Sequence, residues 1–247
     1  MTRAFLILLF WLFAQTNPAF ADRITVAVAS NFLTTARDIS AVFEAETGHE
    51  VALVHGSSGK LFAQITAGAP YDVFLSADRA RPERLAETGR AVAGSVKPYA
   101  YGRLALVHGA KTAPATLDQI LSRTDLRIAI ADPAIAPYGV AAREVLREFR
   151  GPTWAQDLVY GESVGQAFAF VATGNADAGL VALAQAKTYQ GDLWVLEVPE
   201  DLHDPIEQDA ALLTRAGNNA AARGFLDFLG ADFSRDLLIA QGYGVPE

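Results

Sequence analysis

The sequence predicts an α/β fold divided into two lobes. Short apolar runs alternate with stretches of helical spacing, a pattern typical of parallel sheets covered by helices on both faces. The alternation forms two series, the second of which begins near Tyr101. Four of the apolar runs end in a small polar or glycine-bearing turn that opens directly into a helical pattern, at residues 25–32, 51–61, 128–142 and 158–168.

The first series extends from residue 24 to residue 87. Residues 24–29 are expected to form a strand, and the apolar residues from Phe32 to Phe43 then repeat at helical spacing. This helix should end at Gly48, since glycine commonly follows the last helical residue. The remaining elements expected in this series are strands at 51–54 and 71–75 and helices at 60–67 and 81–87.

The second series has the same alternation, followed by a C-terminal tail. Its first strand lies in the run GRLALVHG, and Gly151-Pro152 should end its longest helix. The tail from Asp209 predicts one strand and two helices. The elements expected after GRLALVHG are strands at 127–130, 157–160, 178–184, 194–198 and 210–214, and helices at 117–122, 140–149, 165–173, 220–229 and 233–241.

Two lobes of similar size place a ligand cleft between them. We expect lobe 1 to comprise residues 22–100 plus 206–247 and lobe 2 residues 101–205, so that the chain crosses between the lobes twice. Ligands of open α/β sheets bind at the carboxyl ends of the parallel strands. Each lobe contributes two of the four strand-to-helix junctions to such a cleft.

Residues 1–21 are typical of a secretory signal peptide. Arg3 supplies a positive charge, residues 4–14 an apolar segment, and Ala19 to Ala21 an A-x-A cleavage site, so the mature chain should begin at Asp22. No segment is long enough to span a membrane as a helix. The sequence has no cysteine, which excludes a lipid anchor at the cleavage site. We expect a periplasmic protein that is not lipid-anchored, and a monomer.

Charge and composition exclude several classes of function. Without residues 1–21 the chain has 19 basic and 28 acidic residues and a net charge of about −9, which argues against nucleic acid as a partner. The four histidines are widely spaced, and without cysteine there is no thiolate site. We therefore expect no direct ligands for a metal cation and no resident cofactor.

The four junctions favour an anion as ligand. A helix N-terminus presents unpaired backbone N–H groups and the positive end of the helix dipole, so it binds anions without a charged side chain. Small residues at these junctions, including Ser30, Ser58 and Gly139, permit close approach of the backbone to a ligand. Three of the four junctions contain no arginine or lysine.

Several segments together resemble the periplasmic molybdate-binding proteins of ABC importers, the ModA family. The resemblance extends from Ile24 to Tyr243, and its most specific segment is GAPYDVFLSAD at residues 68–78. Other matching segments are VAVASNF, GSSGKLFAQITA, ADPAIAPYG, ESVGQAFAFVATGNADAGLVAL and the terminal QGYG.

This resemblance implies a two-lobe periplasmic binding protein fold of type II, with molybdate or tungstate in the cleft between the lobes. It also implies a partner, the membrane permease of an ABC importer. Carried over position by position, the ligand contacts are the following: Ser30 with Asn31, Ser58, the backbone N–H of Tyr138 and the backbone N–H of Val164.

One position departs from the family pattern. Where some members have a tyrosine hydroxyl, this chain has Ala182, which has no side-chain donor. The family contact made by that hydroxyl is therefore absent here. Asn31, which offers both an amide and a backbone N–H, is the nearest candidate to replace it.

Two alternatives remain open from the residues. The first keeps the fold and changes the ligand to another tetrahedral oxyanion, such as sulfate or phosphate. The second is a secreted serine hydrolase, since GESVG at 161–165 matches the nucleophile motif G-x-S-x-G, and Asp192 and His203 follow Ser163 in the order of a catalytic triad.

Lys60 indicates no further site. The run GSSGKL at 56–61 has glycines too closely spaced for a phosphate-binding P-loop, and leucine follows the lysine where serine or threonine is required. Lys60 is expected to be a solvated residue of the first helical turn.

Overall fold

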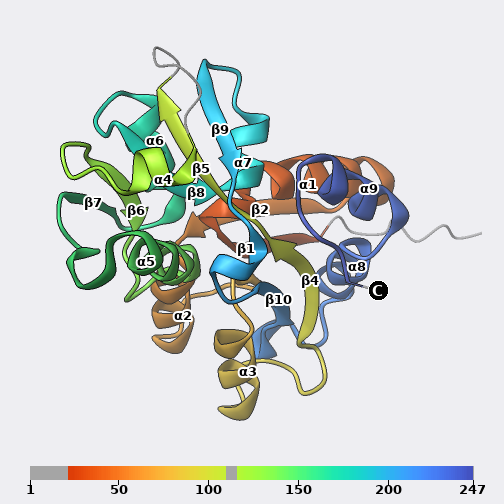
Figure 1. Ribbon diagram of the computed structural model, residues 1–247. Helices are drawn as coiled ribbons and strands as arrows, with labels where there is room; N and C mark the ends of the chain where they lie inside the picture. The colour runs from red at the N-terminus through yellow and green to blue at the C-terminus, as the bar shows by residue number, and fades with distance from the viewer. Residues whose placement is uncertain (1–21, 110–115, 247) are drawn as a thin grey trace, which may run out of the picture.

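The computed structural model describes residues 22–109 and 116–246 and divides them between two lobes (Figure 1). Each lobe is built on a five-stranded sheet, with the order β2-β1-β3-β10-β4 in lobe 1 and β7-β6-β8-β5-β9 in lobe 2. Helices cover the sheets, so the expected α/β class is confirmed. The expected signal peptide, residues 1–21, lies outside the described residues.

Lobe 1 contains the first four strands and the C-terminal tail. It has two 3₁₀ turns, η1 (Ser30–Phe32) and η4 (Thr214–Ala216). Its strands and helices are β1 (Arg23–Ala29), α1 (Leu33–Thr47), β2 (Glu50–Gly56), α2 (Ser58–Thr66), β3 (Val73–Leu75), α3 (Ala80–Glu87), β4 (Lys97–Gly102), β10 (Ile206–Leu212), α8 (Ala220–Phe228) and α9 (Asp232–Ala240).

Lobe 2 contains the segment between the two crossings. Its 3₁₀ turns are η2 (Gly151–Thr153) and η3 (Glu200–Leu202). Its strands and helices are β5 (Leu104–Gly109), α4 (Leu117–Leu121), β6 (Ile128–Ala131), α5 (Pro137–Arg150), β7 (Leu158–Gly161), α6 (Val164–Ala172), β8 (Ala178–Ala182), α7 (Leu183–Thr188) and β9 (Leu193–Glu197).

The sheet of lobe 1 is covered on both faces because its inner strand β1 carries apolar side chains on both of its faces. Val26 and Val28 of β1 pack into the cluster that contains Phe32 and Phe225, whereas Ala27 between them packs with Leu61 of α2 on the opposite face. Side chains alternate across a strand, so one apolar run can supply two cores. The central strands are thereby held rigidly, and their carboxyl ends open at the cleft.

Both sheets are mixed, which corrects the expectation of parallel sheets. The strand β10 runs antiparallel to β3 and β4, and β5 runs antiparallel to β8 and β9. These are the two strands by which the chain enters a lobe from the other lobe. Because the neighbouring strands end at the cleft and an entering strand starts there, the entering strand must run in the opposite direction.

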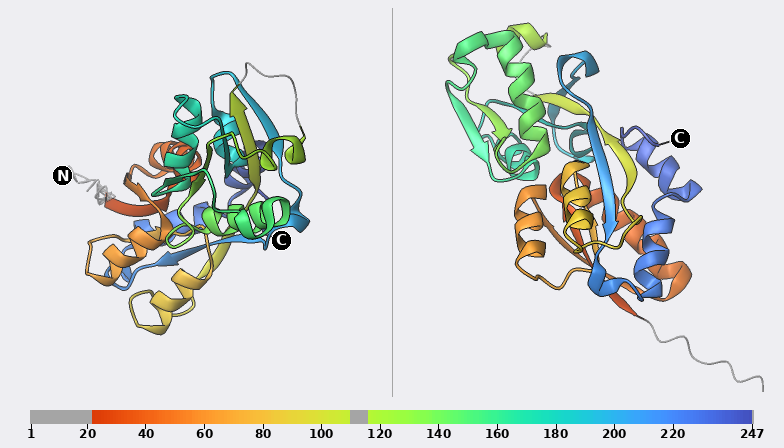
Figure 2. Two further views of the ribbon diagram at one scale, coloured as in Figure 1. Left: turned by 60° about the vertical axis from the view of Figure 1, so that its left-hand side comes forward. Right: turned by 90° about the horizontal axis from the view of Figure 1, so that it is seen from below.

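The crossing from lobe 1 to lobe 2 lies at Arg103, later than the boundary expected after residue 100. The strand β4 continues to Gly102 and pairs with β10, with Ala100 opposite Gln208 and Gly102 opposite Ile206. Figure 2 shows the two crossing segments side by side between the lobes. The strand β4 and the helix α7 were not expected from the sequence; α7 begins inside the run predicted to continue a strand to residue 184.

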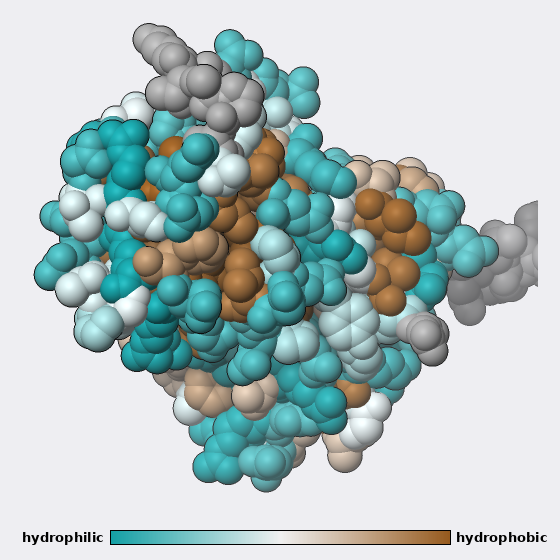
Figure 3. Space-filling view, viewed as in Figure 1, coloured by the Kyte–Doolittle hydropathy of each residue, from teal (hydrophilic) through white to brown (hydrophobic). Residues whose placement is uncertain are grey.

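The surface is mostly hydrophilic in the view of Figure 3, with a hydrophobic patch where Figure 1 places α9. In that helix Phe233 and Ile239 are exposed. Among the residues described, none of the helices has the length and apolarity needed to cross a membrane.

Two helical glycines should respond in opposite directions to alanine. A Cβ on Gly139 would overlap the carbonyl group of Ala131, so Gly139→Ala should lower the free energy of unfolding by about 1 to 3 kcal/mol. On Gly224 the nearest atoms are those of Phe43 at 3.8 Å, so Gly224→Ala should raise the free energy of unfolding by about 0.5 to 1 kcal/mol. Urea denaturation of both variants measures these changes. A stabilised Gly139→Ala variant would contradict the close packing of α5 on β6.

Candidate functional site

The four junctions identified in the sequence converge on one pocket between the lobes. The strands β1 and β2 bring the first two to it from lobe 1, and the N-termini of α5 and α6 bring the other two from lobe 2. The cavity is small, about 10 Å³, far below the roughly 300 to 1,000 Å³ of sites for drug-sized ligands. It is lined by Ala29, Ser30, Asn31, Gly56, Ser57, Ser58, Ala77, Ala136, Pro137, Tyr138 and Val164.

All five candidate ligand residues line this pocket, namely Ser30, Asn31, Ser58, Tyr138 and Val164. Every one of them is more than nine-tenths buried. The lining contains no arginine, lysine, aspartate or glutamate in the described part of the chain. The pocket is therefore small and has no formally charged side chain in its lining.

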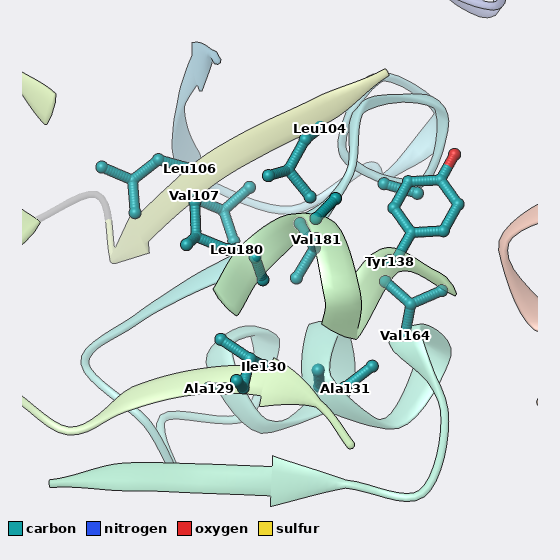
Figure 4. Packing of buried hydrophobic residues seen from close by; sticks show 14 of the residues in the cluster. Leu104, Leu106, Val107, Ala129, Ile130, Ala131, Tyr138, Val164, Leu180 and Val181 are labelled. Atoms are coloured by element: carbon teal, nitrogen blue, oxygen red, sulfur yellow. The ribbon is translucent and has the colours of Figure 1, made fainter. Parts of the chain in front are cut away.

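Lobe 2 offers backbone donors. Tyr138 lies in the first turn of α5, which starts at Pro137, and Val164 is the first residue of α6. The N–H groups of a first helical turn have no intrahelical acceptor, and within residues 22–109 and 116–246 neither N–H is bonded to another protein group. Figure 4 shows the two side chains next to each other at one edge of the core cluster, with the Tyr138 hydroxyl directed away from the aliphatic residues. The packing of these side chains fixes where the two N–H groups lie.

Lobe 1 offers hydroxyl donors. The Oγ atom of Ser30 accepts a hydrogen bond from the Gly165 N–H at 3.1 Å, and the Oγ atom of Ser58 accepts one from the Ala77 N–H at 2.9 Å. Each serine oxygen is thus positioned by a backbone donor. Its own O–H hydrogen remains free to donate, which is the orientation that an anion requires.

Asn31 is held by groups outside the pocket. Its side-chain Nδ2 donates to Oε1 of Gln208 at 2.9 Å, and its backbone carbonyl accepts from the Tyr243 hydroxyl at 2.9 Å. Among the described residues its Oδ1 is buried without a hydrogen-bond partner. One Nδ2 hydrogen is therefore committed to Gln208, and the donors left to Asn31 are the second Nδ2 hydrogen and the backbone N–H.

Ala182 lies away from the pocket lining. It is the last residue of β8, fully buried, and is paired with Leu104 of β5. Alanine has no hydroxyl, and Ala182 is not among the residues that line the pocket. Asn31, by contrast, does line the pocket.

The lobes are in contact around the pocket, so the structure is a closed form. The N–H of Gly59 in lobe 1 donates to the carbonyl of Ile135 in lobe 2 at 2.9 Å. A Cβ on Gly59 would lie 2.8 Å from that oxygen, and one on Gly165 would lie 3.2 Å from Cβ of Ser30. Glycine at both positions lets the backbones of the two lobes meet.

Lys60 is an exposed residue in the first turn of α2, as expected, and it also takes part in this interface. Its Nζ lies 2.5 Å from Oε2 of Glu162 in lobe 2. The two side chains are 45% and 70% exposed, so the ion pair is worth at most about 1 kcal/mol. It adds to the closed form without determining it.

Burial also controls the titratable groups beside the pocket. Burial raises the pKa of the phenols of Tyr99, Tyr138 and Tyr243 well above the ordinary value, so all three keep their protons. Burial likewise raises the pKa of Asp209 to about 6, with Arg79 opposing the shift and the carboxylates of Glu207, Glu83 and Asp78 adding to it. Asp209 directly follows Gln208 in the crossing strand β10.

The groups of the predicted triad are not joined to one another in the described residues. The Oγ of Ser163 accepts from the Gln166 N–H at 3.3 Å as the N-cap of α6, and Nδ1 of His203 lies 2.7 Å from the carbonyl of Asp204. Nε2 of His203 is buried and has no partner there. The glycines of the motif serve close packing, since a Cβ on Gly161 would lie 2.6 Å from the Ala167 nitrogen.

Sequence reasoning missed the residues that hold the site in place. Gln208 accepts a hydrogen bond from Asn31 and another from Tyr99. Gln185 donates to the Ser30 carbonyl at 3.3 Å. The signal for Gln208 was a polar pair, Gln208-Asp209, at the start of an apolar run. The predicted strand begins only at Ala210, so this pair lies outside it.

Comparison with known proteins gives matches over almost the whole chain. A family model described as bacterial extracellular solute-binding protein matches residues 24–244. The molybdate-binding protein ModA of Rhodobacter capsulatus is 44% identical over 231 residues, which cover 92% of this chain and 90% of that protein. The chain belongs to the ModA family.

Further members of the ModA family agree with this assignment. The ModA protein of Azotobacter vinelandii is 43% identical over 235 residues, covering 91% of each chain. A solved structure of a periplasmic molybdate-binding protein from Azotobacter vinelandii is 37% identical, with a TM-score of 0.82 over 91% of this chain and 100% of that one. The two-lobe fold of type II expected from the sequence is thereby confirmed.

The raised pKa of Asp209 predicts a pH dependence of stability. Its folded-state pKa of about 6 lies above the ordinary value of 3.8, so the native state retains this proton more strongly than the unfolded state. Stability from this group is present below about pH 4 and is lost as the pH rises through about 6. Asp209→Asn should remove this loss and raise the free energy of unfolding at pH 7.5 by about 1 to 2 kcal/mol relative to wild type.

Urea denaturation at pH 4.5 and pH 7.5 measures the effect. Asp201→Asn, which changes an exposed aspartate of η3, is the matched control and should follow the wild-type pH dependence. An Asp209→Asn variant that loses as much stability between the two pH values as the wild type would contradict the assignment.

Proposed function

We propose that this chain is a periplasmic solute-binding protein that captures molybdate or tungstate between its lobes and delivers it to the membrane permease of an ABC importer. One observation carries the proposal: a single small pocket is lined by residues from four junctions and two lobes, namely Ser30, Asn31, Ser58, Tyr138 and Val164. The ModA membership of the chain supports the identity of the anion.

Neutral donors suit a tetrahedral dianion. Burying an isolated charge is very costly unless its atoms are hydrogen-bonded. Serine hydroxyls from lobe 1 and helix N-termini from lobe 2 can together supply about one to two donors for each of four oxygens. A set made only of donors also discriminates against a protonated phosphate, whose hydrogen would meet another donor.

Binding and closure are one event in this proposal. Only the closed form brings the serines of lobe 1 and the N–H groups of lobe 2 to the same pocket, so the oxyanion stabilises the closed form by its contacts with both lobes. The permease would then recognise the closed, loaded monomer. The proposed role includes no catalytic step.

Ser58→Ala should weaken molybdate binding by about 1 to 3 kcal/mol, because it removes a hydroxyl donor from a buried anion. Ser163→Ala is the matched control: it removes a serine at another junction whose Oγ caps α6 outside the pocket lining, and it should bind molybdate nearly as wild type does. Isothermal titration calorimetry of the mature chain gives both values.

The same titration separates the alternatives. Sulfate or phosphate binding as tightly as molybdate would replace the proposed ligand by another oxyanion. Turnover of a chromogenic ester that Ser163→Ala abolishes would establish the hydrolase instead. Equal affinity of wild type and Ser58→Ala would contradict the proposed pocket.

A further inference from the structure

A buried polar network lies at the crossing between the lobes, behind the pocket. At its centre is Gln208 of β10, which is fully buried. Its Oε1 accepts from Asn31 Nδ2 at 2.9 Å and from the Tyr99 hydroxyl at 3.0 Å, and its Nε2 lies 3.3 Å from the Tyr138 hydroxyl. Gln208 thus contacts two of the five candidate ligand residues, while it does not line the pocket itself.

The orientation of the Gln208 amide follows from these partners. The Asn31 amide donates to Oε1, and the single hydrogen of the Tyr99 hydroxyl is shared between Oε1 at 3.0 Å and the Ser76 carbonyl at 3.1 Å. A reversed amide would point its NH₂ group at the NH₂ group of Asn31. The NH₂ group is therefore directed at the Tyr138 hydroxyl oxygen, whose lone pairs accept the hydrogen bond.

The network joins the two lobes. Asn31 and Tyr99 belong to lobe 1, whereas Tyr138 belongs to α5 of lobe 2. Gly102 makes room for the junction, because a Cβ there would lie 2.5 Å from Gln208 Nε2 and would also overlap the Tyr138 hydroxyl. The hydrogen bond between Gln208 and Tyr138 forms only when α5 is docked against the crossing strands.

We propose that Gln208 is a positioning residue for the oxyanion site, which makes the placement of Asn31 in lobe 1 depend on the docking of Tyr138 in lobe 2. This inference rests on the proposed function. When the lobes close, Nε2 of Gln208 donates to the Tyr138 hydroxyl while its Oε1 accepts from the Asn31 amide. Ligand-binding residues of both lobes are thereby positioned at the same time. Gln208 touches no ligand atom in this role.

Gln208→Leu tests the proposal, with Gln241→Leu as the matched control. Gln241 is also a buried glutamine with both ends bonded, to Thr35 at 2.5 Å and to Asp38 at 2.9 Å, but all its partners lie in lobe 1. Both variants should lose thermal stability. Only Gln208→Leu should raise the dissociation constant for sodium molybdate, by about tenfold to a hundredfold.

Kinetics separate positioning from a structural defect. Because the contact with Tyr138 exists in the closed form and association starts from the open form, Gln208→Leu should raise the dissociation rate about as much as the dissociation constant. The association rate should stay within about twofold of wild type. Gly102→Ala, which displaces the same contact by steric overlap, should give the same pattern. Stopped-flow fluorescence measures both rates.

A double-mutant cycle that combines Gln208→Leu with Asn31→Ala tests whether Gln208 acts through Asn31. If Gln208 acts through Asn31, the double variant should bind molybdate nearly as well as the weaker single variant. If Gln208→Leu binds molybdate with unchanged affinity, or if Gln241→Leu loses as much affinity, the positioning role is wrong. The proposed function stands in either case as long as the wild-type chain binds molybdate. Failure of the wild-type chain to bind molybdate would overturn the proposed function and the positioning role with it.

Discussion

The structure depends on one electrostatic constraint, which is that a small dianion can be buried only if each of its oxygens is hydrogen-bonded. The pocket meets this constraint with hydroxyls and helix N-termini and has no cationic side chain in its lining. A single helix N-terminus points in one direction and cannot surround a tetrahedral ion. Donors must therefore arrive from several directions, and two facing lobes supply them.

The rest of the architecture follows from this requirement. The parallel strands of each sheet end at the cleft, and the helices that follow them start there. The entering strands β5 and β10 run the opposite way and link the lobes at the back of the pocket. Glycine at positions 59 and 165 allows the lobes to approach closely enough for the donors to converge. The polar contacts between the lobes are individually small, namely an exposed ion pair and a few hydrogen bonds. Ala29 and Ala77 of lobe 1 also pack against the core of lobe 2. In the proposed function, the anion adds its own contacts with both lobes to these.

Much of the fold and of the site could be predicted because its signals are local. The junctions that supply Ser30, Ser58, Tyr138 and Val164 each lie within a few residues of a strand, a turn and a helix start, so they are visible in the sequence. The partners that hold them are not. Lys60 and Glu162 are separated by 102 positions, Tyr99 and Gln208 by 109, and Asn31 and Gln208 by 177. Nor does periodicity report strand direction, which is why β5 and β10 were expected in parallel sheets. The crossing at Arg103 was placed too early because β4, which contains Pro98 and Gly102, shows little apolar alternation.

A crystal structure of residues 22–247 grown with sodium molybdate would show whether donors from both lobes hold one anion. We expect one tetrahedral anion between the lobes, within hydrogen-bonding distance of Oγ of Ser30 and Ser58 and of the backbone nitrogens of Tyr138 and Val164. An anion bound to one lobe alone, or held by arginine or lysine side chains elsewhere on the chain, would contradict it.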